Sequence, residues 1–373
     1  MSKLTTSREE RGQAIAQERG QVVRIDDRTY RVKSQTHHGW YKVCRVGEEW
    51  VCECADNVYR HLICKHIFAV DFSKQLRLQV QDSRVIQEVN VSNCKFCGSS
   101  NIRKDGVRKN KAGVIQIFEC KDCHKYMTFN LGFEHMKHNP QAITTAMQLY
   151  FSGESLRNTQ KSLKLLGVQV SHKTIFMWIK KYISLMQKYV ETLKPNVSDT
   201  WRADELFVKI SGNQKYLFAM MDDETRFWIA QQVADKKYVA NIRPMFKQAR
   251  KVADKNPATI ISDGASNFAM AINDEFSDPR TRPTHYRDIA FDGHIHNNKM
   301  ERMNGELRDR EKVMRSLKKE DSPILKGMQI FHNFIRPHMG LKGSTPAEMA
   351  GIQVKGENKW KTLIENAKES EKA

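Results

Sequence analysis

Hydrophobic and polar residues in the first half of the chain predict a small β-rich segment followed by a helical one. Residues 28–54 contain three short runs of alternating polarity with β-branched or aromatic side chains, which is typical of strands. A short apolar helix is expected over 63–72. From 141 to 190 the pattern becomes helical, with Gly153 and Gly167 near the expected helix ends, and it gives a helix-turn-helix outline.

The second half of the chain favours an α/β fold class. Residues 200–212 form one apolar run, and 214–234 contains two more, joined by the turn-like DDET as in an antiparallel hairpin. A short buried strand stops at Asp263, and a long helix is expected from about 297 to 318. Strands, a crossover helix, another strand and a long helix together predict an α/β core.

The length of the chain indicates the number of domains, and its charge indicates the class of binding partner. The 373 residues leave room for roughly two to four domains. The 62 lysines and arginines exceed the 43 aspartates and glutamates, so nucleic acid is the expected partner, ahead of a membrane surface or an acidic protein. With no spanning apolar run and no signal-peptide core, we expect a soluble intracellular protein whose cysteines stay reduced.

A first cluster of metal-ligand residues has the pattern C-x-C-x9-C-x-H and consists of Cys52, Cys54, Cys64 and His66. The first two share a strand face, and the last two lie where the chain turns into the short helix, so the four side chains can converge on Zn²⁺. The pattern resembles the SWIM zinc finger over roughly 28–72. The alternative is a group of reduced thiols in a core.

A second cluster consists of two C-x2-C pairs, Cys94 with Cys97 and Cys120 with Cys123, separated by 22 residues. This spacing is a strong signature of a zinc ribbon, and a basic hairpin is expected between the pairs. The segment resembles the N-terminal zinc ribbon of insertion-sequence transposases. A redox pair is disfavoured because no βαβ pattern surrounds either pair. Cys44 is left over, as a buried strand residue.

The third helix of the helical segment, 171–190, is the candidate DNA-reading element. Ser171 is a suitable N-cap. The positions expected to face the core are Ile175, Trp178, Ile179, Tyr182 and Met186. The exposed side then carries His172, Lys173, Lys180 and Lys181, which could lie in the major groove. The alternative is a solvated basic face on a linker bundle.

Two aspartates have contexts that point to a metal. Asp204 lies inside an apolar strand, and Asp263 lies at the end of a later one. Burying an aspartate in such a strand costs several kcal/mol unless the carboxylate is paired or binds a cation. A divalent cation shared by Asp204 and Asp263 is the simplest solution.

Five segments together resemble a DDE-type transposase of an insertion sequence, with an integrase-like RNase H catalytic core. They are WRADELFVKISG, DDETRFWI, ISDGASNF, HNNKMERMNGELRDREK and FIRPHMGLKGSTPAEMAG, within about 195–352. By position, Asp204, Asp263 and Glu301 match the three carboxylates of the family. The gap of 37 residues before Glu301 is slightly longer than usual, which we attribute to the polar insert DEFSDPRTRPTHYRD.

The resemblance implies two-metal chemistry with Mg²⁺ or Mn²⁺, cations that hard carboxylates suit. Hydrolysis would free the 3′ end of the element, and the same site would transfer that end into target DNA. On the helix that carries Glu301, a basic stripe would follow the DNA phosphates and consists of Arg308, Lys312 and Arg315. The opposite side should pack on the sheet through Met303, Leu307, Met314 and Leu317.

Other acidic residues are expected to be structural. Asp222 and Asp223 lie at the hairpin turn, and Glu205 points to the strand face opposite Asp204. Glu306 and Glu311 are expected to form surface pairs with Arg302, Arg310 and Arg315. Glu348 should close a capping box with Thr345. His294 and His296 could contact DNA near the site.

The expected organisation is multidomain, with small zinc-binding β/α modules, a helical segment and an α/β RNase H-like core. Its segments are a polar tail at 1–20, a SWIM-type zinc finger at 21–85, a zinc ribbon at 86–133, a helix-turn-helix segment at 134–195, a DDE catalytic core at 196–353 and a charged tail at 354–373.

These features favour a cytoplasmic, nucleoid-associated prokaryotic transposase with two structural Zn²⁺. Its partners would be double-stranded DNA, at the terminal repeats and the target, and further copies of the chain, because two element ends must be held together. One alternative is a domesticated transposase that acts as a zinc-finger DNA-binding regulator without catalysis. Another is an RNase H-like nuclease that cuts without joining, which the DNA-reading modules disfavour.

Overall fold

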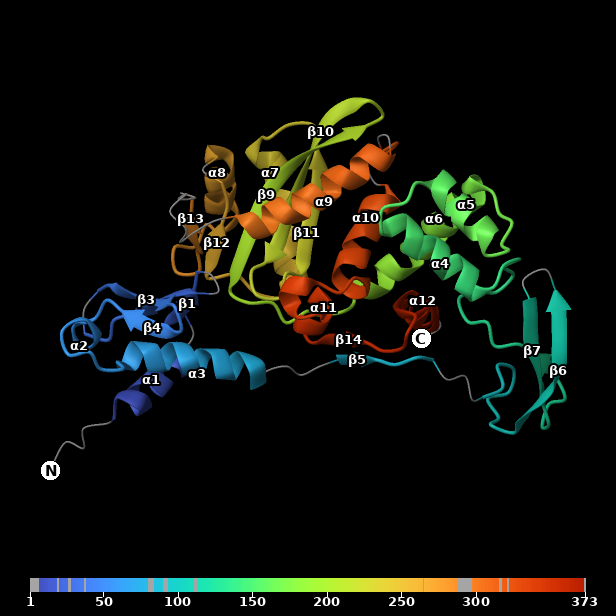
Figure 1. Ribbon diagram of the computed structural model, residues 1–373, viewed down its shortest axis with the longest axis horizontal. Helices are drawn as coiled ribbons and strands as arrows, with labels where there is room; N and C mark the ends of the chain where they lie inside the picture. Colours follow the sequence, from blue (N-terminus) through green and yellow to red (C-terminus); the bar gives the residue numbers. More distant parts are fainter. Residues whose placement is uncertain are drawn as a thin grey trace. The chain divides into compact units, whose positions relative to one another are not determined.

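The chain forms two compact units, each built from segments that are far apart in the sequence (Figure 1). The first contains 1–82, 194–308 and 349–351, and the second contains 83–193, 309–348 and 352–373. The computed structural model describes residues 7–18, 20–25, 28–36, 38–79, 84–89, 93–110, 113–263, 265–287, 297–314, 317–320 and 322–371.

The first unit begins with a small module of strands and helices. Its antiparallel sheet has the order β1 (Val22–Arg24), β2 (Thr29–Lys33), β3 (Trp40–Val46) and β4 (Glu49–Cys52). The short α2 (Ala55–Val58) leads to α3 (Lys65–Gln79), and α1 (Arg8–Gln17) packs on α3. The three strands expected over 28–54 are confirmed, and β1 adds a fourth at the edge.

The same unit contains a mixed five-stranded sheet of the order β11-β10-β9-β12-β13. Strands β9 (Thr200–Ile210), β10 (Asn213–Asp222) and β11 (Trp228–Ala234) are antiparallel, which confirms the hairpin at DDET. Strands β12 (Thr259–Ile261) and β13 (Thr284–Tyr286) run parallel to β9. This order and these directions are those of the expected integrase-like RNase H core.

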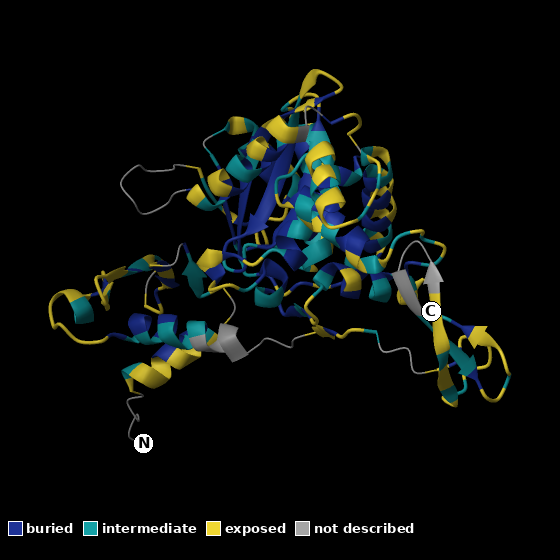
Figure 2. Cartoon of the chain, turned by 45° about the vertical axis from the view of Figure 1, so that its right-hand side comes forward, coloured by how far each residue is buried: buried dark blue, intermediate teal, exposed yellow. Residues whose placement is uncertain are grey.

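Helices cover this sheet, and its central strands are buried (Figure 2). They are α7 (Val239–Ala253), α8 (Ser266–Glu275) and the long α9 (Asn298–Met314). Large aromatic side chains of both layers are fully buried: Trp201, Phe218, Trp228, Phe246 and Phe268. This apolar interior fixes β9 and β12, on which the candidate site is built.

The second unit combines a β-hairpin with a helical bundle. Strands β6 (Ile102–Asn110), β7 (Gly113–Cys120) and β8 (Tyr126–Met127) form a three-stranded antiparallel sheet. The bundle consists of α4 (Pro140–Phe151), α5 (Leu156–Leu165), α6 (His172–Val190), α10 (Pro323–Ile330) and α12 (Lys359–Ser370), with a π-helical turn η1 (Phe331–Ile335), a 3-10 turn η2 (Met339–Leu341) and α11 (Pro346–Met349). Strand β5 (Arg84–Ile86) pairs in parallel with β14 (Ile352–Val354).

The three helices expected over 141–190 are confirmed as α4, α5 and α6. The Ser171 hydroxyl accepts a hydrogen bond from the backbone N–H of Thr174, as expected of the N-cap. The five positions of α6 expected to face the core are buried: Ile175, Trp178, Ile179, Tyr182 and Met186. The capping box is also confirmed, because Thr345 and Glu348 exchange hydrogen bonds, and Glu348 additionally accepts one from Lys359.

The two expected tails contain packed helices. In the first 20 residues, α1 buries Ile15 against the N-terminal module of β2, β3, β4 and α3. The segment expected as a charged tail, 354–373, contains α12, whose Trp360, Leu363 and Ile364 are buried. Their spacing places these side chains on one face of the helix, and the lysines and glutamates take the other. Among the described residues, no helix combines the length and apolar character needed to cross a lipid bilayer.

Candidate active site and zinc centres

The register of two parallel strands brings Asp204 and Asp263 together. Ile261, the last residue of β12, pairs with Arg202 of β9. Asp263 follows Ile261 by two residues, and Asp204 follows Arg202 by two residues. Because side chains two residues apart point to the same face, both carboxylates lie on the same side of the sheet. The metal-binding atoms of these two aspartates lie within 4.8 Å of one another.

Glu205 joins this pair, which corrects its expected place on the opposite strand face. Its carboxylate lies within the same 4.8 Å group as those of Asp204 and Asp263. Strand β12 pairs with β9 only from Thr200 to Arg202, so Glu205 lies beyond the last paired residue. Lys237 forms an ion pair with Glu205 and holds it there.

Helix α9 contacts the aspartates through Asn304. The side-chain amide of Asn304 donates a hydrogen bond to Oδ2 of Asp204 at 2.8 Å. Glu301 lies one turn earlier on this helix, and its side chain is exposed. Residues three positions apart share a helix face, so Glu301 projects from the side of α9 that faces Asp204. Its carboxylate does not belong to the 4.8 Å group in the part of the chain that the structure describes.

The donor set of this site suits a hard divalent cation. Among the described residues, Oε2 of Glu205 and Oδ1 of Asn304 are buried acceptors with no hydrogen-bond partner. Buried oxygens of this kind are normally satisfied, and carboxylate and amide oxygens are the ligands that Mg²⁺ prefers. Orphaned acceptors beside two aspartates therefore fit a metal site.

The electrostatics of the site agree with this fit. Burial, together with the negative charges of Asp263, Glu205 and Glu301, raises the pKa of Asp204 to about 7. A bound cation would offset both the desolvation and the repulsion.

The hairpin turn holds two aspartates with different structural roles. Asp222 is buried and accepts hydrogen bonds from Ser198 and Thr225, which agrees with the expected turn role. Asp223 is also fully buried, but it forms ion pairs with Arg202 and Lys299. The sequence pattern gave no sign of these ion pairs, because the partners are 21 and 76 residues away.

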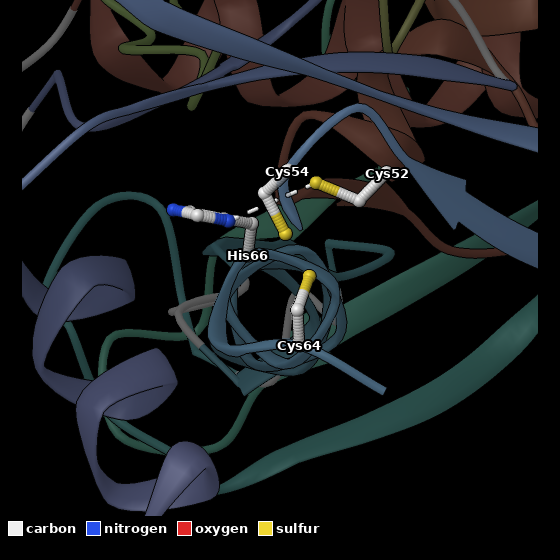
Figure 3. Close-up of side chains that lie close together, drawn as sticks. All are labelled: Cys52, Cys54, Cys64 and His66. Carbon is white, nitrogen blue, oxygen red and sulfur yellow. Dashed lines mark hydrogen bonds between the residues drawn. The ribbon is translucent and has the colours of Figure 1, made fainter. Parts of the chain in front are cut away.

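The first cysteine cluster lies between β4 and α3 and converges as expected (Figure 3). Its four side chains are buried: Cys52, Cys54, Cys64 and His66. Sγ of Cys52 lies 3.7 Å from Nδ1 of His66. Ligands placed tetrahedrally at about 2.0–2.3 Å from Zn²⁺ are roughly 3.5–3.8 Å apart, so this geometry fits a zinc ion.

The second cysteine cluster lies in the hairpin of the other unit. Sγ of Cys94 is 3.6 Å from that of Cys123, and Sγ of Cys97 is 3.6 Å from that of Cys120. These separations also fit tetrahedral coordination by four thiolates. Cys44 lies on β3 as expected, but it is only partly buried.

The residues expected to contact DNA are partly confirmed as exposed. On α6, Lys173, Lys180 and Lys181 are exposed and His172 is half-buried; on α9, Arg308 and Lys312 are exposed. Arg315 lies outside the described residues, as do His294 and His296. Arg310, expected as a surface partner of a glutamate, is buried and stacks over the ring of Tyr150.

Sequence comparison gives a match over the catalytic core. A family model described as DDE domain, of the IS240 transposase type, matches residues 198–338. Similar proteins include the transposase for insertion sequence-like element IS431mec of Staphylococcus aureus (strain Mu50) and the transposase for insertion sequence element IS257 in transposon Tn4003 of the same species. Each is 27% identical over 144 residues, which is 38% of this chain and 62% of the relative.

Among solved structures, the HTLV-2 integrase catalytic core domain in complex with magnesium (trimeric form) matches 42% of this chain and 98% of its own, at 20% identity and a TM-score of 0.31. The fold assignment rests on the strand order of the sheet and not on this overlap. The matched segment spans less than two thirds of the length of the staphylococcal relatives. Residues 198–338, which include Asp204, Asp263 and Glu301, match the DDE domain model, and the chain is similar to transposases of insertion sequences.

Proposed function

We propose that this chain is a DNA transposase that binds the ends of its insertion element, cleaves them at the 3′ side and transfers them into target DNA. The observation that carries the proposal is the meeting of Asp204, within β9, and Asp263, just past the end of β12, beside the helix that bears Glu301. The family match over 198–338 supports the same reaction class.

The three carboxylates Asp204, Asp263 and Glu301 would hold Mg²⁺ or Mn²⁺. When bound, these cations polarise the scissile phosphate and stabilise the leaving oxygen. Asn304 keeps Oδ2 of Asp204 in a fixed orientation, and Lys237 holds Glu205 next to the aspartates. Such prearranged groups lower the reorganisation needed during phosphoryl transfer.

The proposed reaction has two phosphoryl-transfer steps. In the first, a water oxygen bonds to phosphorus and the bond from phosphorus to the 3′ oxygen of the element end breaks, which leaves a 3′-hydroxyl. In the second, that 3′ oxygen bonds to a phosphorus of target DNA, and the 3′ oxygen of the target strand leaves. The first step hydrolyses one phosphodiester bond and leaves a 5′-phosphate on the flanking DNA, and the second exchanges one phosphodiester bond for another. In each step one phosphorus–oxygen bond forms as another breaks at the same phosphorus, so one set of carboxylates can serve both.

The substrate class follows from the charge and from the exposed basic residues. The net charge of +19 favours a polyanion, and Arg308 and Lys312 lie on α9 beyond Glu301. On α6, Lys173, Lys180 and Lys181 offer a second basic surface to duplex DNA. Zn²⁺ at the two cysteine clusters would stabilise the modules that precede the core.

Two further features belong to the same proposal. Two element ends must be joined to one target, so we infer a homodimer or a larger assembly on DNA. A substrate that consists of element and chromosomal DNA places the protein on the nucleoid, in the cytoplasm of a prokaryotic cell.

The test is cleavage and strand transfer by the purified full chain. The zinc-loaded protein is incubated with Mg²⁺, a target plasmid and DNA that carries the inverted repeats flanking its gene. We expect strand-transfer products that are lost in Asp263→Asn and kept in the control Asp274→Asn, whose carboxylate is exposed on α8. Binding of the repeats without cleavage by the wild type would overturn the proposal and favour a DNA-binding regulator.

A further inference from the structure

A buried ion cluster lies next to the candidate active site and is not explained by the chemistry above. The side chain of Asp223 is fully buried and faces three cations. Its Oδ1 accepts hydrogen bonds from Nε of Arg202 and from Nζ of Lys299, the latter at 2.9 Å. Its Oδ2 lies 3.4 Å from Nη1 of Arg24.

Two of these cations belong to the elements that carry the catalytic carboxylates. Arg202 precedes Asp204 by two residues on β9, and Lys299 precedes Glu301 by two residues on α9. Nζ of Lys299 also donates to the backbone carbonyl of Asp223 at 2.9 Å. The first turn of α9 is therefore attached to the hairpin turn of the sheet through Lys299.

The third cation comes from the N-terminal zinc-finger module. Arg24 is the last residue of β1, and only 12% of its side chain is exposed. Its backbone carbonyl accepts a hydrogen bond from Oγ1 of Thr200, at the start of β9, at 2.7 Å. A second module residue, Arg31, stacks over the ring of Tyr286 on β13, at 5.4 Å from the centroid. The module is thus docked on the catalytic sheet, and Arg24 reaches furthest into it.

The arrangement around Asp223 makes Arg24 more than a peripheral contact. Burial alone would raise the pKa of Asp223, but the charges of Arg202, Lys299 and Arg24 outweigh it and lower the pKa. Nη1 of Arg24 lies 3.4 Å from Oδ2 of Asp223 and 3.5 Å from Oε1 of Glu224, so Arg24 pairs with both acids of the hairpin turn. Removal of Arg24 takes one of the three counter-charges away from this buried carboxylate, which weakens the constraint on its orientation and loosens its hydrogen bond to Lys299.

We propose that Arg24 is a positioning residue through which the zinc-finger module holds α9, and with it Glu301 and Asn304, over Asp204. The path runs from Arg24 to Asp223, from Asp223 to Lys299, and along one turn of α9 to the site. This role rests on the proposed function for its effect on cleavage, but the docking itself is a property of the folded chain. Loss of the module contact would leave DNA binding intact and disturb the placement of the third carboxylate.

The test uses the zinc-loaded full chain with Arg24→Gln, the conservative Arg24→Lys, and the control Arg45→Gln, which removes an exposed arginine of the same module. Hydrogen exchange reports on the peptide that covers the first two turns of α9, and exchange of β9 and β10 reports on overall folding. Cleavage at saturating DNA and the Kd for DNA are measured separately.

We expect Arg24→Gln to speed exchange in α9 but not in β9 and β10, and to slow cleavage by about tenfold to a hundredfold, the range for small misplacements of catalytic groups, at unchanged Kd. Arg24→Lys should recover part of both effects, and Arg45→Gln should match the wild type. If Arg24→Gln unfolds the sheet, the proposal is tested with Arg24→Lys by the same measurements of hydrogen exchange, cleavage and Kd.

Unchanged exchange in α9 would overturn the proposal whether or not cleavage falls. A rise in Kd that accounts for the whole loss of cleavage would also overturn it, because Arg24 would then act as a DNA contact. Failure of the wild type to cleave would count against the proposed function alone, since the exchange of α9 still decides whether Arg24 holds this helix.

Discussion

Asn304 on α9 donates a hydrogen bond to Oδ2 of Asp204 on β9, across 100 residues of sequence. This contact ties the helix that bears Glu301 to the strand that bears the first aspartate. We expect Asn304→Ala to slow cleavage by about tenfold to a hundredfold, because the Asp204 carboxylate loses its fixed orientation. The measurement is single-turnover cleavage across a series of Mg²⁺ concentrations.

The matched control for this prediction is Asn298→Ala, which removes an exposed asparagine from the same helix. A similar loss in both variants would mean that Asn304 acts through helix stability and not through Asp204. A loss confined to Asn304→Ala, with unchanged affinity for DNA, would support orientation of the carboxylate.

The third carboxylate of the site is predicted to be Glu301. Glu301→Gln should abolish cleavage, because an amide cannot supply the negative charge that a divalent cation requires. Glu306→Gln should leave most of the activity. Glu205→Gln should reduce cleavage without abolishing it, because Glu205 lies within the 4.8 Å group but is held in an ion pair with Lys237.

These three isosteric variants are compared by the yield of cleaved element ends at saturating Mg²⁺. Complete loss in Glu205→Gln with activity retained in Glu301→Gln would transfer the ligand role to Glu205. Binding of the repeat DNA by each variant serves as the control for folding.

The two cysteine clusters are predicted to bind about two Zn²⁺ per chain, one at each cluster. Cys64→Ser and Cys97→Ser should each lower the zinc content by about one ion, since three remaining ligands hold zinc weakly. Elemental analysis of protein purified with zinc gives the ratio directly. Cys44→Ser, outside both clusters, should keep the full content; a loss of zinc in this variant would contradict the assignment.

Stability is predicted to depend on pH through His285. Nε2 of His285 lies 2.8 Å from Oγ of Ser262, and burial, followed by the charge of Arg287, lowers the pKa of His285 from 6.5 to about 4. As pH falls, His285 is protonated in the unfolded chain before it is protonated in the folded one. The stability that the neutral His285 provides is therefore fully present above about pH 6.5 and is lost as pH falls toward 4.

Denaturant unfolding over this pH range, in the wild type and in His285→Gln, checks the prediction. The variant should show a smaller fall in the free energy of unfolding between about pH 6.5 and 4.5. His61→Gln, an exposed histidine of the zinc-finger module, is the control. Equal pH slopes in the wild type and His285→Gln would contradict the assignment.

Replacement of two glycines by alanine should change the free energy of unfolding in opposite directions. A methyl group at Gly327 on α10 would overlap the ring of Phe151 and lie 3.0 Å from Cδ1 of Ile183, whereas one at Gly305 on α9 would meet open space. We expect Gly327→Ala to lower the free energy of unfolding by about 1–3 kcal/mol. Gly305→Ala should raise it by up to about 1 kcal/mol, because alanine has the higher helix propensity. Thermal unfolding of both variants measures the difference; destabilisation by Gly305→Ala would contradict the open space.

Local patterns along the chain determined the elements and several of their capping residues. Helical spacing identified the buried face of α6, alternation identified β2 to β4, and the turn-like DDET identified the β10–β11 hairpin. The two cysteine clusters were also readable, because their spacings within strands and turns place the ligands without help from distant contacts. Asp204 could likewise be predicted as a metal ligand from its neighbours in the sequence, because it is an acidic residue inside an apolar strand.

Only the tertiary structure decided which side chains of these elements contact one another. The ion pair of Glu205 with Lys237 joins residues 32 positions apart, and the hydrogen bond of Asn304 to Asp204 joins residues 100 positions apart. The cluster at Asp223 gathers side chains from β1, β9 and α9, and the helix α12 finds its apolar partners in α4 and α6. Such contacts depend on strand register and on the packing of distant segments, whose free energies arise only when the whole chain is compact. A short stretch of sequence is enough to predict a helix or a strand, but the residue that pairs with a buried charge lies in a distant part of the sequence.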